Sequence, residues 1–181
     1  RADIDKARVS KSPRLSRILV AVDPPTTSQA TSDACGLVVV GATEGDSPHA
    51  FVLHDGTVER ARPLDWAQKA VALADQFGAE SVLAEINQGG EMVAATLAQV
   101  DPDMPVLARH ASRSKRGRAV PVSLLYARGR VHHVGQFDAL EDEMCAFGSS
   151  AQKGSPDRVD ALVWAVSELL LSNGTPRLTF L

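Results

Sequence analysis

The segment Arg17–Asp23 places the strongest constraint on the fold of this chain. Five consecutive apolar residues, three of them β-branched, lead to a carboxylate and then to Pro24 and Pro25. Such a run predicts a short strand that is buried on both faces, and the two prolines prevent its continuation. Because burying an unpaired carboxylate is costly, Asp23 needs a positive partner, and a divalent cation would serve. The sequence must then supply further acidic ligands nearby.

The rest of the chain alternates between strand and helix patterns. The predicted strands cover residues 17–23, 35–41, 50–54, 81–86, 104–108 and, briefly, 130–134, and the predicted helices cover 63–77, 91–100, 115–127, 137–147 and 155–171. Short links between the first three strands predict an antiparallel meander. With 181 residues, 44% of them hydrophobic, the chain suits a single α/β domain with its own core. Residues 1–16 lack hydrophobic periodicity and are predicted to be a linker, which leaves residues 17–181 as the domain.

Two further acids are candidates for a site with Asp23. Glu85 ends the strand at 81–86, and Asp160 lies in the first turns of the last predicted helix, beside its apolar stripe. If the strands ending at Asp23 and Glu85 are parallel neighbours, both carboxylates emerge at the same sheet edge. Asp157 shares a helix face with Asp160, although an acid there also favours the helix dipole without any ligand.

Oxygen-only ligands of this kind suit hard cations such as Mg²⁺ or Mn²⁺. Two such ions about 3.5–4 Å apart can activate a water molecule and stabilise a leaving oxygen. The acids therefore predict a two-metal site for phosphodiester hydrolysis.

Positive charge is concentrated elsewhere in the chain. The net charge is −3, yet residues 109–135 contain seven Lys or Arg, three His and no acid. This segregation favours a polyanionic partner on one surface and metal-binding acids on another. The alternative is a solvated charged face with no partner.

Four short motifs then carry a family resemblance. They are Val22–Pro24, Ala84–Gly90, Gly129–Gly135 and Pro156–Ala165. Together they resemble the C-terminal nuclease domain of the large terminases of phages and gene transfer agents, over roughly residues 17–170. The resemblance implies an α/β fold of the RNase H-like class. This fold is a mixed five-stranded sheet, with an antiparallel meander and parallel strands, flanked by helices.

The same resemblance implies an activity and the residues responsible for it. The family cuts concatemeric double-stranded DNA during genome packaging, and its catalytic acids match Asp23, Glu85 and Asp160. These three and Asp157 would hold two Mg²⁺ or Mn²⁺ ions. Asp33 also matches a frequently acidic position, but it serves equally well as a turn residue at the start of the next strand.

The basic segment gains a role from the resemblance. Lys115, Arg116 and Arg118 are candidates for phosphate contacts beside the acids, which would give salt-dependent and mostly sequence-independent DNA binding. Arg128 and Arg130 flank a predicted hairpin that would lie over the cleft and gate access to it.

The resemblance also implies partners that this sequence does not contain. The phosphate-binding motif GxxxxGK[ST] of an ATPase motor is absent from the 181 residues. We therefore expect the motor domain elsewhere in the same full-length protein, with the portal and the small terminase subunit as further partners. Two cysteines without metal-type spacing, and no signal peptide or membrane segment, favour the cytoplasm of a bacterial host.

Two other functions remain open at this point. A Holliday-junction resolvase of RNase H-like fold would use acids in the same way. A docking module could keep the fold and bind DNA or a portal without cutting.

Overall fold

The computed structural model describes residues 1–24, 34–60, 62–86, 90–152 and 154–172. The strands are β1 (Arg17–Asp23), β2 (Gly36–Ala42), β3 (Ala50–Asp55), β4 (Ser81–Glu85), β5 (Val106–Arg109) and β6 (Val131–His133). The helices are α1 (Ala2–Ala7), α2 (Pro63–Phe77), α3 (Gly90–Val100), α4 (Lys115–Ala127), α5 (Asp138–Ala146) and α6 (Asp157–Leu170). None of these helices, within the residues described, is long and apolar enough to cross a membrane.

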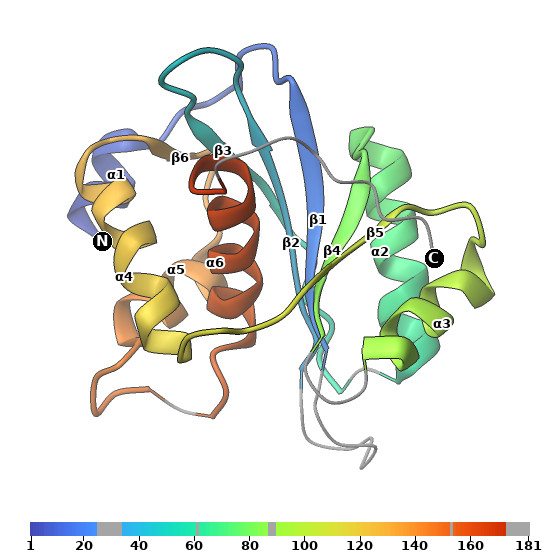
Figure 1. The fold of residues 1–181 in the computed structure, drawn as a ribbon. Helices are drawn as coiled ribbons and strands as arrows, with labels where there is room; N and C mark the ends of the chain where they lie inside the picture. The colour runs from blue at the N-terminus through green and yellow to red at the C-terminus, as the bar shows by residue number, and fades with distance from the viewer. Residues whose placement is uncertain (25–33, 61, 87–89, 153, 173–181) are drawn as a thin grey trace.

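The strands form one mixed sheet in the order β5-β4-β1-β2-β3-β6 (Figure 1). β1, β2 and β3 are antiparallel neighbours, as the predicted meander requires, and β4 and β5 continue the sheet in parallel beyond β1. The resemblance implied five strands in the sheet, which is one too few, because the strand predicted at 130–134 also joins it. Residues 131–133 pair in parallel with β3 and make a sixth strand at the opposite edge.

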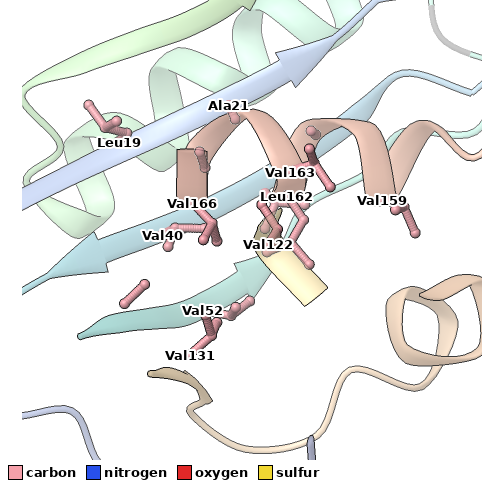
Figure 2. Close-up of a cluster of buried hydrophobic side chains, with 14 of the residues drawn as sticks. Leu19, Ala21, Val40, Val52, Val122, Val131, Val159, Leu162, Val163 and Val166 are labelled. Carbon is pink, nitrogen blue, oxygen red and sulfur yellow. The ribbon is translucent and has the colours of Figure 1, made fainter. Parts of the chain in front are cut away.

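Both faces of the central strands are covered by helices. Leu19 and Ala21 of β1 belong to a core shared with α4 and α6, part of which Figure 2 shows, and Val20 and Val22 belong to a second core under α2 and α3. Figure 1 shows the corresponding layers, with α1, α4, α5 and α6 on one side of the sheet and α2 and α3 on the other. Because successive side chains of a strand alternate between faces, Asp23 follows Leu19 and Ala21 onto the face covered by α6.

Helix α6 begins two residues later than the sequence predicted. Its N-cap is Pro156, which has no side chain to accept a hydrogen bond, so Ser155 does not cap the helix. Instead, Glu143 of α5 accepts a hydrogen bond of 2.9 Å from the backbone N–H of Val159. An acid distant in sequence thus satisfies a free N–H of the first turn, as a capping side chain would.

Gly36 allows α6 to approach the sheet closely. It pairs with Asp23 across β1 and β2, and a Cβ built on it would overlap the backbone carbonyl of Asp157. Any larger residue at this position would push the first turn of α6 away from the end of β1. A glycine therefore sets the distance between the two elements that carry Asp23 and Asp160.

Residues 1–16 are not the extended linker that the sequence predicted. They include α1, whose Ile4 is buried in the core, and Val9 forms an isolated parallel bridge with Val134 beside β6. The guanidinium of Arg8 forms two hydrogen bonds, of 2.7 and 2.9 Å, with the carboxylate of Glu141. This attachment depends on one buried apolar side chain, on ion pairs of Arg1 and Arg8 with acids of α5, and on backbone pairing, so it produces no apolar stripe in the sequence.

Glu141 also anchors a buried polar chain. Its Oε1 accepts a hydrogen bond of 2.9 Å from His133 Nδ1, and His133 Nε2 accepts one of 2.8 Å from the hydroxyl of Tyr126. The hydrogen bonds from Arg8 lower the pKa of Glu141 to about 2, and burial lowers the pKa of His133. A neutral imidazole therefore links an ionised carboxylate to a phenol inside the protein. Cys145 is exposed on α5.

Replacing Gly36 with Ala should displace the start of α6. The added Cβ must be accommodated by backbone, so we expect a loss of stability of about 1–3 kcal/mol. Amide hydrogen exchange should also speed up at Val159 and Asp160, the first hydrogen-bonded amides of the helix. Gly41→Ala is the matched control, because it crowds the same strand at its other end against the side chain of Leu15. Unchanged exchange at both amides in Gly36→Ala would contradict this account of the packing.

Replacing Glu141 with Gln should lower stability at pH 7 by about 2–4 kcal/mol, because it removes the buried carboxylate that pairs with Arg8 and leaves that partly buried guanidinium only the exposed Asp5 as an ionic partner. The folded-state pKa of Glu141, about 2, lies below its usual value of 4.5. Its stabilisation is therefore complete above about pH 5 and declines as the pH falls towards 2. Urea unfolding across this range should show the gap between wild type and variant closing with acid. Asp142→Asn, on the exposed side of α5, should change little at any pH.

Candidate metal and nucleic-acid site

Three of the predicted acids meet at one end of the sheet, the lower end in Figure 1, where α4 and α6 begin. β1 and β4 are parallel neighbours, and Val22 pairs with Ala84 directly before Asp23 and Glu85. Strand alternation places Glu85, like Asp23, on the face covered by α6, and the first turns of α6 bring Asp160 to the same place. The side chains are mostly removed from solvent, with exposed fractions of 13% for Asp23, 10% for Glu85 and 1% for Asp160.

Two basic side chains from the first turns of α4 contact these acids. Lys115 Nζ forms an ion pair with Asp160 Oδ2 and lies 3.9 Å from Asp23 Oδ2. Arg118 Nη2 lies 3.1 Å from Glu85 Oε2 and 3.8 Å from Asp160 Oδ1. The Asp160 carboxylate therefore lies between the side chains of Lys115 and Arg118.

Asp23 and Asp160 are harder to ionise than isolated carboxylic acids. Burial raises the pKa of Asp23 to about 8, Lys115 opposes this shift, and the negative charges of Asp160, Asp157 and Glu85 add to it. Burial likewise raises the pKa of Asp160 against the opposing charges of Lys115 and Arg118. Lys115 and Arg118 thus leave part of the negative charge uncompensated.

The side chains present fit a hard cation. Every acidic donor is a carboxylate oxygen, the type of ligand that Mg²⁺ and Mn²⁺ prefer. The raised pKa values of Asp23 and Asp160 indicate that added positive charge would be favourable here. Among the described residues, however, no three acids, histidines or cysteines are already gathered as a metal cluster. A cation would need the acids to close in, with Lys115 and Arg118 rearranging.

The basic residues do not all lie near the acids. Arg116 is exposed at the start of α4, next to the acidic cluster. Arg130, by contrast, lies at the other end of the sheet, because its carbonyl accepts a hydrogen bond from Ala50, the first residue of β3, which runs in the same direction as β1. Arg128 lies at the C-terminal end of α4, and a helix of 13 residues is about 20 Å long.

The structure therefore places Arg128, Arg130 and the predicted gate at 128–135 away from the acidic cluster. The segment forms β6 at the far edge of the sheet, and it does not form a hairpin over the acids. The sequence could identify a strand there but not the edge that it joins. Asp33 lies outside the described residues.

One residue of the cluster was missed by the sequence reasoning. Trp164 Nε1 donates a hydrogen bond of 2.7 Å to Glu85 Oε2, and the Arg118 guanidinium lies 4.7 Å from the indole ring centre. Trp164 is four residues after Asp160 on α6, so helical spacing places both on the same face. This spacing from Asp160 is the sequence feature from which Trp164 could have been predicted to lie at the site.

Solved structures with a similar fold include two terminase nucleases. The large terminase nuclease from the thermophilic phage G20c with bound magnesium is 17% identical, with a TM-score of 0.62 over 84% of this chain and 81% of that chain. The nuclease domain of the large terminase subunit of bacterial virus Sf6 is 16% identical, with a TM-score of 0.57 over 83% and 88%. RuvC of Thermus thermophilus is 17% identical, with a TM-score of 0.48 over 83% and 91%.

Sequence comparison gives a family assignment. No match was found among curated proteins. Residues 20–169, which include Asp23, Glu85 and Asp160, match the family model described as the terminase RNaseH-like domain. This chain therefore belongs to the terminase RNase H-like domain family.

Proposed function

We propose that this domain is a metal-dependent endonuclease that cuts double-stranded DNA during genome packaging. The proposal rests on one observation. Asp23, Glu85 and Asp160 lie together at one end of an RNase H-like sheet. The family assignment supports it, and so does the fold shared with nucleases of phages G20c and Sf6.

In this proposal Asp23, Glu85 and Asp160 hold two divalent cations, with Asp157 as a further ligand. The similar large terminase nuclease of phage G20c has been solved with magnesium, zinc and cobalt bound, which supports a divalent metal. For this chain we propose Mg²⁺ or Mn²⁺, because all the donors are carboxylate oxygens. When bound, such ions activate a water molecule and stabilise the leaving 3′ oxygen.

The protein's own residues have separate tasks in this reaction. The carboxylates supply the negative charge that retains the cations, and their burial keeps competing water away. Lys115 and Arg118 counter the repulsion among the acids and are within reach of an incoming phosphate. Arg116, exposed beside them, contacts the DNA backbone outside the cluster.

The wider setting of the proposal is a packaging machine. We propose that an ATPase motor in the same full-length protein moves the DNA, with the portal and the small terminase subunit as further partners. The terminase family assignment supports this setting.

A plasmid-nicking assay tests the proposal directly. Supercoiled plasmid should be nicked and linearised with Mg²⁺ or Mn²⁺ and should remain intact with EDTA. Cutting confined to four-way junctions would instead indicate a resolvase. DNA binding without cutting under any divalent metal would indicate a docking module.

Asp23→Asn should abolish plasmid cutting while the domain stays folded. Because Asp23 is buried among like charges, the neutral amide should also raise the unfolding temperature in EDTA by a few degrees. Asp160→Asn should abolish cutting too. Asp142→Asn serves as the control, since it removes an exposed acid on α5 and should leave cutting unchanged. Cutting at the wild-type rate by both site variants would rule out the assigned acids.

Arg116→Ala should weaken binding to unrelated duplexes by a similar factor. Loss of one phosphate contact should reduce the slope of log affinity against log salt by about one. Arg128→Ala removes the same charge at the other end of α4 and should leave the slope unchanged. Fluorescence anisotropy with a labelled duplex in EDTA measures both variants. Equal slopes for the two would place DNA binding on another surface.

A further inference from the structure

Trp164 and Arg118 converge on a single oxygen of Glu85. The indole N–H of Trp164 donates to Glu85 Oε2 at 2.7 Å, and Arg118 Nη2 lies 3.1 Å from the same atom. The guanidinium also lies over the indole ring, 4.7 Å from its centre. The three side chains come from α6, α4 and β4, so this contact joins the three elements around the candidate site.

The indole and the guanidinium affect Glu85 differently. Both fix the orientation of the carboxylate, because two donors on one oxygen limit rotation about the last side-chain bond. Arg118, however, also neutralises the carboxylate, and it is shared with Asp160. The indole is a neutral donor, so it orients Glu85 and leaves the full negative charge available to a cation.

The indole is also held firmly. Trp164 is partly buried and packs against the core under α6, and Arg118 covers its ring. Trp164 lies on α6 one turn after Asp160. The same helix therefore positions Asp160 directly and Glu85 through the indole. Outer hydrogen bonds of this kind typically change metal affinity by about 10–100-fold when removed.

We propose that Trp164 is a positioning residue that orients Glu85 for divalent metal through its indole N–H. This inference rests on the proposed metal-dependent nuclease function and deepens it. Trp164 itself contacts neither metal nor DNA in this account. Its role is exerted through the Glu85 carboxylate.

The first test is calorimetry of Mn²⁺ binding to the wild type, to Trp164→Phe and to Trp66→Phe. Phenylalanine keeps an aromatic ring beside Arg118 and removes the donor. We expect the Mn²⁺ dissociation constant of Trp164→Phe to rise about 10–100-fold. Trp66 lies buried in the other core, under α2, and its replacement should leave the constant unchanged. A purely structural role for Trp164 would lower the unfolding temperature and leave the dissociation constant as it was.

The second test needs no change at position 164. The sequence contains two tryptophans, so Trp66→Phe leaves Trp164 as the only indole fluorophore. Its emission should change on titration with Mg²⁺, with a midpoint that matches the Mg²⁺ dissociation constant measured by calorimetry on the same variant. This measurement remains decisive if Trp164→Phe fails to fold.

The outcomes separate the inference from the function on which it rests. A wild type that binds Mn²⁺ and nicks plasmid, with Trp164→Phe binding Mn²⁺ equally well, overturns the inference alone. Emission of Trp164 that stays constant while Mn²⁺ or Mg²⁺ binds also overturns it. A wild type that binds no divalent cation and cuts no DNA overturns both. Weakened binding in Trp164→Phe with a responsive Trp164 supports the inference.

Discussion

Burying Asp23, Glu85 and Asp160 in one cluster costs free energy that nearby positive charge offsets. The chain supplies that charge from Lys115 and Arg118, in the first turns of α4, which begins at the same end of the sheet. The compensation is incomplete, since the pKa of Asp23 stays near 8 and that of Asp160 is raised. The conformation of this end of the molecule therefore depends on how much cationic charge is present.

The distances within the cluster are set by residues that carry no charge in it. Gly36 lets the first turn of α6 come against the end of β1, and Glu143 satisfies the Val159 amide in that turn. These contacts fix the distance between Asp160 and the sheet. A site of acids that repel one another needs such outside support, because the acids would otherwise move apart.

Much of this arrangement could be predicted from the sequence, because it follows from strand periodicity. The apolar runs before Asp23 and Glu85 predicted buried strands that end in acids. The structure places both acids at the same end of the sheet. What could not be predicted depends on long-range pairing. The edge that β6 joins and the attachment of Arg8 to Glu141 are decided by contacts between residues far apart in the chain. For that reason Arg128 and Arg130 were assigned to the wrong end of the sheet.

The two buried carboxylate clusters of the described structure show how a functional site can be told from a structural one. Glu141 accepts hydrogen bonds from Arg8, His133 and the Phe137 amide, and its pKa falls to about 2. Its charge is fully compensated by the protein, which is what stability alone requires. Asp23 is also largely withdrawn from water, with 13% of its side chain exposed, yet burial raises its pKa to about 8 despite a lysine nearby. A bound cation would supply positive charge that Lys115 alone does not, and strongly perturbed acids of this kind gather at functional sites.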